Sequence, residues 1–258
     1  MSELFSIQLQ NRQQQGGDGV WLDLPTTTEQ VQVALRQIGI SSDNPQGLFI
    51  SGYFAEEEKR FAISYNMVLA SNVDELNFLA SRLETLSTGE RAELNAALQA
   101  PQSELFSIGR ITDFPENVDY YVHLPDVHGP AQLGDYYLNR SGMVDMPEEW
   151  KGGIDTAQFG RYVAQQEQGV FTEYGYLVKS GDEWQKVHEG QPVPEEYRVL
   201  SFPAPEVLRD SANIPPPVQP ETEPQKVIPI ILNGKDSAER MKEITDRLET
   251  GIQELFDS

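Results

Sequence analysis

Cysteine is absent from the sequence, which excludes disulfide bonds, thiolate metal sites and cysteine nucleophiles. Long hydrophobic runs are also absent, since no segment approaches the roughly 18 apolar residues of a membrane span. The first ten residues contain an early Glu3 and lack a basic stretch followed by an apolar one. This pattern does not predict a secretory signal. We therefore expect a cytoplasmic protein that makes no membrane contact.

Catalytic signatures are equally scarce. The sequence contains no G-x-S-x-G elbow, no P-loop and no G-x-G-x-x-G fingerprint. Its histidines are His123, His128 and His188, and a site made by the first two with Asp126 would match none of the specific metal-ligand spacings. The residues give no support to an enzyme, so we expect no catalytic activity, no metal and no cofactor.

Basic residues are few. The chain has 19 Lys and Arg against 41 Asp and Glu, for a formal net charge of −22, and residues 111–139 hold five acids and no Lys or Arg. Uncompensated carboxylates repel one another, so they serve either solubility or a basic partner. Proteins that hold DNA do so with Lys and Arg, and a folded acidic protein could occupy such a groove. Both interpretations remain open at this point.

The candidate partner-binding acids share a place in or near the middle of the chain. Carboxylates about 6 Å apart on a helix or about 7 Å apart on a strand face approximate the spacing of successive phosphates. Each of them has the alternative of being an ordinary solvated acid, and Asp155 has two more, as a helix cap or as the ion-pair partner of Arg161. The candidates are Asp113, Glu116, Asp119, Asp126, Asp135, Asp145, Glu148, Glu149 and Asp155.

The first hundred residues alternate between strand and helix patterns. Apolar alternation predicts strands at 5–9, around 21–23, at 47–53 and at 61–65. Helices are predicted where a capping residue precedes an apolar face. These are Val31, Ala34, Leu35 and Ile38 after residues 26–28, Leu76, Leu79, Ala80 and Leu83 after Asn72, and Leu94, Ala97 and Leu98 after Ser87 or Thr88.

The hexapeptide SELFSI occurs at residues 2–7 and again at 103–108. In the second copy the apolar residues recur at intervals of three and Ser103 can act as a cap, so a helix is predicted there. Beyond it we expect a strand over 118–124 with an acidic outer face. The remaining predictions are helices at 131–139, 147–150 and 155–165, a hairpin at 169–178 around Gly175, and added strands within 180–202.

Proline marks the end of the folded body. Residues 203–229 contain 8 of the 17 prolines, which predicts an extended linker. After it, an apolar stripe from Met241 to Leu255 predicts an amphipathic helix. The chain is thus of the α+β class and divides into a small α+β unit at 1–66, a helical unit at 67–112, a second α+β unit with an acidic surface at 113–202, a linker at 203–235 and a helix at 236–258.

Several large side chains have no expected chemistry. We assign Trp21, Trp150 and the group Tyr120, Tyr121 and Tyr137 to the core or to a dimer contact. For Arg161 we favour a structural role, holding the hairpin to a helix, over direct contact with a partner.

Three segments resemble the ArdA family of antirestriction proteins, and the resemblance covers about the first 180 residues. They are GVWLDLPTTTEQVQVAL at 19–35, NVDELNFLASRLETL at 72–86 and LGDYYLNRSGMVDMPEEWKGGIDTAQFGRYVAQQEQGVFTEYGYLV at 133–178. The last is the most specific, because Ile154, Asp155, Phe159, Gly160 and Arg161 stand where the family has a Tyr-Ile-Asp-Tyr-Glu-Ala-Tyr-Gly-Arg-like stretch. Gly153 and Thr156 depart from that pattern, since they replace aromatic positions.

The resemblance implies an elongated array of small α+β and helical units with antiparallel sheets, assembled as a homodimer. It implies a protein that is not an enzyme and does not bind nucleic acid. The protein is implied to be a DNA mimic, which occupies the DNA-binding groove of type I restriction-modification enzymes. Mobile elements, conjugative transposons among them, carry such proteins and thereby escape restriction. The nine acids would then form the imitating surface, while Phe159, Gly160 and Arg161 form a structural motif.

The C-terminal region departs from this family. Residues 239–258 resemble the opening helix of ArdC-type domains, which bind single-stranded DNA, and the chain would then be a piece of a longer mobile-element protein. An alternative function follows from the same region: a mobile-element scaffold or adaptor that binds a partner through its linker and helix, whose apolar stripe calls for burial.

Overall fold

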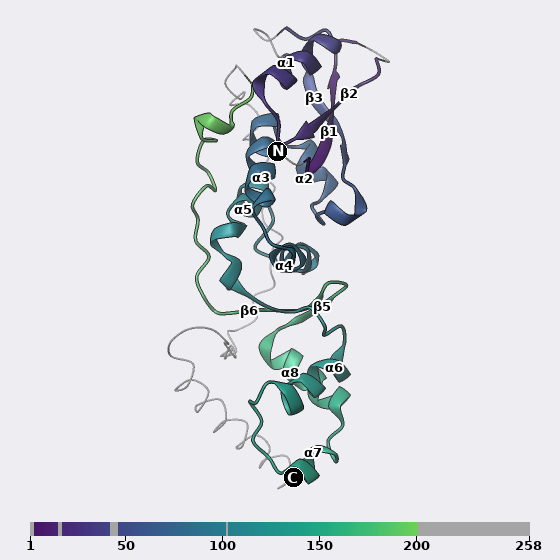
Figure 1. Ribbon diagram of the computed structural model, residues 1–258, viewed down its shortest axis with the longest axis vertical. Coiled ribbons are helices and arrows are strands. Elements are labelled where there is room, and N and C mark those ends of the chain that lie inside the picture. The colour runs from purple at the N-terminus through teal and green to yellow at the C-terminus, as the bar shows by residue number, and fades with distance from the viewer. Residues whose placement is uncertain (1–2, 15–16, 42–45, 102, 201–258) are drawn as a thin grey trace, which may run out of the picture. The chain divides into compact units, whose positions relative to one another are not determined.

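The computed structural model describes residues 3–14, 17–41, 46–101 and 103–200 (Figure 1). Helices and antiparallel sheets are both present, which confirms the α+β class. The described chain forms two compact units, the first from residues 3–91, 104–116 and 185–200 and the second from 92–103 and 117–184. The predicted linker at 203–235 and helix at 236–258 lie outside the described residues. The finer domain boundaries remain predictions.

The first unit contains a three-stranded antiparallel sheet. Its strands are β1 (Phe5–Asn11), β2 (Val20–Leu24) and β3 (Leu48–Phe54), in the order β2-β1-β3. Ile7 pairs with Leu22 across the sheet, and the inward side chains of β1 and β2 are buried. The three strands predicted here are confirmed, because strict alternation of apolar and polar residues matches a sheet with one buried face.

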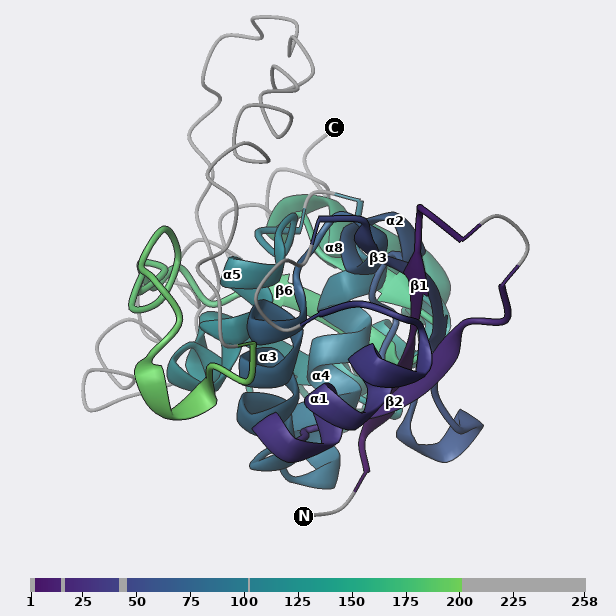
Figure 2. The same ribbon diagram turned by 90° about the horizontal axis from the view of Figure 1, so that it is seen from above.

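Helices α1 (Thr28–Gln37) and α3 (Val73–Glu84) lie beside β2, and α2 (Tyr65–Leu69) lies beside β3 (Figure 2). The predicted caps are present. Thr27 forms a capping box with Gln30, and Asn72 forms one with Glu75. Each cap satisfies backbone N–H groups that a helix leaves without an internal partner, which is why these helix starts were predictable.

The strand predicted at 61–65 is wrong. Residues 60–64 have no regular structure, and a short helical turn, η1 (Glu57–Lys59), precedes them. Phe61 and Ile63 are both buried, at 2% and 6% exposure, so the alternation is real. It reflects side-chain packing of a segment that is not part of a sheet, and periodicity alone does not distinguish such a segment from a strand.

Helix α4 (Thr88–Gln99) begins as predicted, since the Ser87 hydroxyl accepts a hydrogen bond from the Glu90 N–H and the Glu90 carboxylate accepts one from the Ser87 N–H. The second SELFSI copy is different from the prediction. Its helix, α5 (Ile108–Thr112), is capped by Ser107 rather than by Ser103. Leu105 is buried outside any helix, so its spacing of three from Ile108 reflected burial only. A further helical turn, η2 (Phe114–Glu116), follows α5.

The strands predicted within 180–202 are absent from the described residues 180–200. Apart from the helical turn η5 (Glu195–Tyr197), residues 185–200 run as an irregular strap beside α3 and α5, drawn in green in Figure 1. Side chains of the first unit take its backbone donors, since Asp74 accepts from the N–H groups of Val199 and Leu200. A segment whose donors are satisfied in this way does not need a neighbouring strand.

The second unit has its own antiparallel sheet, with strands β4 (Tyr121–Leu124), β5 (Val170–Thr172) and β6 (Gly175–Lys179) in the order β4-β6-β5. The β5–β6 hairpin confirms the one predicted around Gly175, whose φ of 122° is a conformation that favours glycine. The strand predicted over 118–124 is shorter than expected, because residues 118–120 form a helical turn, η3 (Val118–Tyr120).

Four helical segments complete the second unit: α6 (Pro130–Asp135), the π-helical η4 (Tyr136–Arg140), α7 (Glu148–Lys151) and α8 (Thr156–Glu167). Helices α6 and α8 lie side by side and very close (Figure 1). A Cβ at Gly160 would stand 1.8 Å from the Pro130 carbonyl oxygen, and one at Gly134 would stand 1.9 Å from that of Thr156. Only glycine permits this approach.

Apolar side chains fill the space between these helices and the second sheet. The buried core is made of Val127, Leu133, Tyr137, Met143, Val163, Tyr176 and Val178, and Phe159 and Phe171 pack against it. Among the described residues of the whole chain, none of the helices combines the length and apolar character that crossing a membrane requires.

Candidate functional site

The nine candidate acids divide unevenly between the units. Asp113 and Glu116 belong to the first unit, and the other seven belong to the second. Between residues 117 and 184 the chain has eleven Asp and Glu and only four Lys and Arg. The second unit therefore has a surplus of negative charge.

Asp113 is not a surface acid, and its place among the candidates is corrected. Its side chain is fully buried, at 0% exposure. One carboxylate oxygen accepts a hydrogen bond from the His188 N–H at 2.6 Å, and the other accepts from the N–H groups of Val187 and Glu189 at 3.3 and 3.2 Å. A charge held by three backbone donors inside the protein cannot meet a partner. It anchors the strap.

Glu116 is half-buried and forms an ion pair with Arg82. Arg110 is similarly occupied, since it bonds Glu104 at 2.8 Å and Glu189 at 3.0 Å. In the first unit these acids are matched by guanidinium groups. Glu116 therefore offers little net charge to a partner.

Two candidates of the second unit are partly compensated at the surface. Asp135 accepts hydrogen bonds from Arg140 at 2.7 Å and from Asn139 at 2.9 Å. The bond from Arg140, followed by that from Asn139, lowers the pKa of Asp135. Glu148 lies 3.1 Å from the Lys151 ammonium, with its own side chain 83% exposed. Ion pairs at the surface contribute little energy, so both carboxylates remain available for contact with a partner.

Four candidates are exposed and form no hydrogen bond or ion pair through their side chains with the part of the chain that the structure describes. They are Asp119 in η3, Asp126 after β4, Asp145 before α7 and Glu149 within α7. Nothing nearby offsets their charge, so they are the strongest candidates for contact with a basic partner. We call these four residues the free acids.

Asp155 caps α8, accepting hydrogen bonds from the N–H groups of Ala157 at 2.9 Å and Gln158 at 3.0 Å. Its predicted alternative as a cap is confirmed. Arg161, expected to hold the hairpin to a helix, is exposed and forms no hydrogen bond or ion pair with the described residues. The geometry therefore supports neither that anchoring role nor an Asp155–Arg161 pair.

The aromatic residues also sort into two groups. Tyr120, Tyr121 and Tyr137 are buried, which confirms their assignment to the core. Trp21 and Trp150 are 49% and 68% exposed, so they do not belong to the core, and the alternative of a dimer contact stays a prediction. Tryptophan is compatible with a buried or an exposed position both in a strand, as at Trp21, and in a short helix, as at Trp150.

A buried polar cluster in the second unit was not predicted. The Glu167 carboxylate accepts hydrogen bonds from the hydroxyl groups of Tyr137 and Tyr176, the latter at 2.8 Å. Burial raises the pKa of Glu167, and the two tyrosine hydrogen bonds oppose that rise. A Cβ at Gly169 would stand 1.9 Å from the Tyr176 hydroxyl, so the glycine after α8 makes room for this cluster. Its three members come from three elements, and no local motif connects them.

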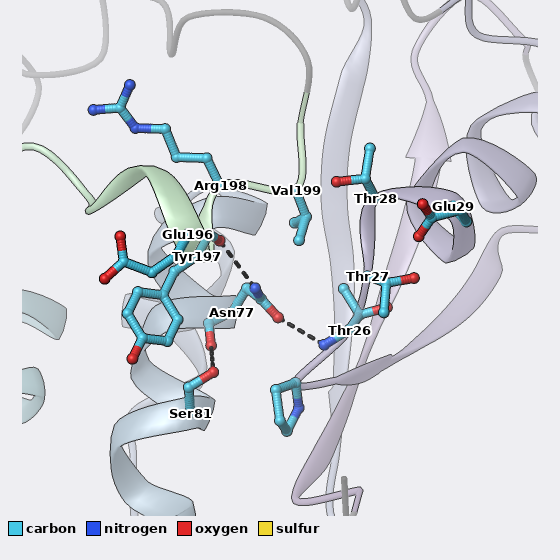
Figure 3. Close-up of a pocket in the computed structure, with 11 residues that line it drawn as sticks. Thr26, Thr27, Thr28, Glu29, Asn77, Ser81, Glu196, Tyr197, Arg198 and Val199 are labelled. Carbon is cyan, nitrogen blue, oxygen red and sulfur yellow. Dashed lines mark hydrogen bonds between the residues drawn. The ribbon is translucent and has the colours of Figure 1, made fainter.

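A cavity of about 320 Å³ in the first unit lies between the start of α1, helix α3 and the strap (Figure 3). Several of its polar groups form hydrogen bonds with one another. Asn77 accepts from the Thr26 N–H at 2.7 Å and donates to the Tyr197 carbonyl oxygen at 2.9 Å, and Ser81 donates to the Asn77 carbonyl oxygen (Figure 3). These bonds connect the start of α1, helix α3 and the strap across the cavity.

The histidines do not gather with acids. Across the described ranges, no three His, Asp or Glu side chains lie close enough together to hold a metal ion. His123 Nε2 lies 2.7 Å from the Tyr174 carbonyl oxygen, and burial lowers the pKa of this histidine. It is tied to the β5–β6 turn.

Comparison with known proteins identifies the class. A family model described as "Antirestriction protein (ArdA)" matches residues 17–178, which include β2 and β3 of the first sheet, nearly all of the second sheet and all seven candidates of the second unit. The chain is an antirestriction protein, of a type that inhibits without catalysis. Within that class it belongs to the ArdA family. A search among curated proteins finds no match.

Proposed function

We propose that this protein is a DNA mimic that occupies the DNA-binding groove of a type I restriction-modification enzyme. The observation that carries the proposal is the set of free acids on the second unit: Asp119, Asp126, Asp145 and Glu149 are exposed and unpaired among the described residues. Asp135, Glu148 and Asp155 add to this surface, whereas Asp113 and Glu116 do not. A homodimer, as the family resemblance implies, is part of the proposal.

The mechanism needs only electrostatics. Duplex DNA carries about one negative charge per 1.7 Å of axis, and a protein that binds it releases counterions in doing so. Carboxylates that enter the same Lys- and Arg-lined groove would release the groove's own anions. Inhibition is then competitive with DNA and non-catalytic, and it weakens steeply as salt rises.

The test is competition for a purified type I methyltransferase core. The full chain should displace labelled duplex DNA, and the plot of log affinity against log salt should have a strong negative slope. The variant D119N/D126N/D145N/E149Q removes four charges from the proposed contact surface, so its slope should be clearly shallower than that of the wild type.

A matched control removes four charges elsewhere. Glu3, Asp18, Glu57 and Glu195 are exposed acids of the first unit, and their side chains have no partner among the described residues. The variant E3Q/D18N/E57Q/E195Q changes net charge equally but should leave the slope close to that of the wild type. Equal effects of the two variants would show that only total charge matters. Loss of inhibition on deleting residues 203–258, with no effect of the free acids, would favour the adaptor instead.

A further inference from the structure

Trp150 is the most exposed large apolar side chain in the part of the chain that the structure describes, at 68%. The turn that holds it is well tied, since the Trp150 N–H donates to the Pro147 carbonyl oxygen and the Gly153 N–H donates to that of Trp150. The indole itself makes no hydrogen bond or ring contact with the described residues. The backbone of this turn is therefore held by hydrogen bonds, while the indole ring is exposed to solvent.

The charges around it are of one sign. Asp145, Glu148 and Glu149 precede Trp150 within five residues and all are exposed. The one cation of this segment, Lys151, lies with its ammonium 3.1 Å from Glu148, and its side chain is only 18% exposed. The indole is therefore the apolar centre of a patch whose rim is anionic.

This charge pattern selects the occupant. A second copy of the chain would bring the same carboxylates to the same place, and opposed like charges are unfavourable. A surface lined with Lys and Arg satisfies both parts of the patch, because carboxylates pair with these cations and tryptophan is the best aromatic partner for a cation above its ring. A DNA-binding groove is such a surface.

We infer that Trp150 is the anchor residue of the partner-binding surface, and that its ring stacks on an Arg or Lys of the groove that the free acids enter. The inference rests on the proposed function and adds a residue to it that carries no charge. Tryptophan and arginine dominate the energetics of many protein interfaces. The acids would speed association and make binding depend on salt. The indole would contribute affinity that remains when salt screens the carboxylate charges.

Trp21 offers a matched control. It is also exposed, at 49%, but it lies on the first sheet and packs edge-on against Phe54, with ring centroids 6.4 Å apart. Replacing Trp21 by alanine removes the same side chain from the first unit.

The experiment measures affinity for the methyltransferase core across a salt series, using wild type, W150A, W150F, W21A and E149Q, all as full chains. W150A should bind roughly 30-fold more weakly at every salt concentration, which corresponds to a strong interface anchor. Its line should run parallel to that of the wild type, because an uncharged side chain releases no counterions. E149Q should instead make the slope shallower, W150F should lose less than W150A, and W21A should match the wild type.

Two results would overturn the inference while leaving the proposed function intact: wild-type affinity in W150A, or an equal loss in W21A and W150A. A change from dimer to monomer in W150A by sedimentation velocity would also overturn it, since the patch would then be an interface between copies. Failure of the wild type to bind at all would overturn the proposed function, and this inference with it. Because Trp150 is exposed, unchanged thermal unfolding of W150A checks that the fold is intact.

Discussion

The two units use the same side chains in opposite ways. In the first unit, Asp74 and Asp113 are buried and their carboxylates hold the strap by its backbone N–H groups. In the second unit, Asp119 and Asp126 stand exposed with no described partner. An acidic composition is therefore not one property. Some carboxylates are structural ligands for backbone donors, and only the remainder is available to a partner.

The strap explains why the first unit can bury acids at all. Burial raises the pKa of Asp74, while the N–H groups of Leu200 and Val199 and the charge of Arg198 lower it. These donors replace the water that a buried carboxylate loses, which is the condition under which such burial is tolerated. The second unit has no comparable segment around its free acids among the described residues, so those acids keep their water.

The largest expected effect on stability comes from D113A. This substitution leaves three partly buried N–H groups without their acceptor, so we expect the first unit to lose about 3 kcal/mol of unfolding free energy. Hydrogen exchange of the Val187, His188 and Glu189 amides should speed up selectively, which locates the loss in the strap. Urea denaturation gives its size.

The matched variant for this comparison is D126A in the second unit, which should change stability by no more than about 0.5 kcal/mol. If D113A and D126A were equally mild, the distinction between structural and free acids would not hold. If both were severe, the second unit would also depend on its surface acids.

A smaller effect is expected from Glu167, the carboxylate of the buried polar cluster in the second unit. Because its folded pKa is raised, the folded state binds more protons than the unfolded state once the pH exceeds the ordinary value of 4.5. Stability from this group is thus fully present below that pH and is lost as the pH rises through the folded pKa, at about 1.4 kcal/mol for each unit of upward shift.

E167Q is permanently neutral and should not show this loss. The stability difference between E167Q and wild type should therefore move in favour of the variant between pH 4.5 and 8, as measured by denaturation at a series of pH values. A difference that stays constant with pH, or that moves in favour of the wild type, would contradict a raised pKa.

The smallest effect is expected from the surface pair Glu148–Lys151. E148Q should change the unfolding free energy by less than about 0.5 kcal/mol, because exposed pairs at this spacing contribute little. The same variant should weaken binding to the methyltransferase core more visibly than it weakens the fold. Thermal unfolding and the salt series measure the two effects side by side, and a large stability loss would move Glu148 into the structural group.

Local signals account for the parts of the fold that the sequence predicted. The caps at Asn72 and Asp155, and the alternation in β1 and β2, are written within a few neighbouring residues. Residues 185–200 could not be predicted in this way, because their backbone partners are side chains more than 70 residues away. Nothing in the local sequence distinguishes the buried Asp113 from the exposed Asp119 six residues later.

The site was predicted with similar limits. Seven of the nine acids chosen from charge and resemblance lie in the second unit, and their role in binding stays a prediction. They did not indicate which acids are compensated, because Arg82, which pairs with Glu116, is distant in the sequence. Trp150 was assigned to the core or to a dimer contact, because apolar character usually predicts burial, yet it is exposed in the short helix α7.

The strap also bears on how the protein can be shortened. The family match ends at residue 178, yet the donors that satisfy Asp113 and Asp74 lie at 187–189 and 199–200. A fragment cut at the family boundary would lose the backbone donors of both carboxylates and would uncover Phe78, against which His188 and Tyr197 of the strap pack, so we expect it to be less stable. Expression trials and domain fusions should therefore treat Leu200, rather than Val178, as the earliest safe end point.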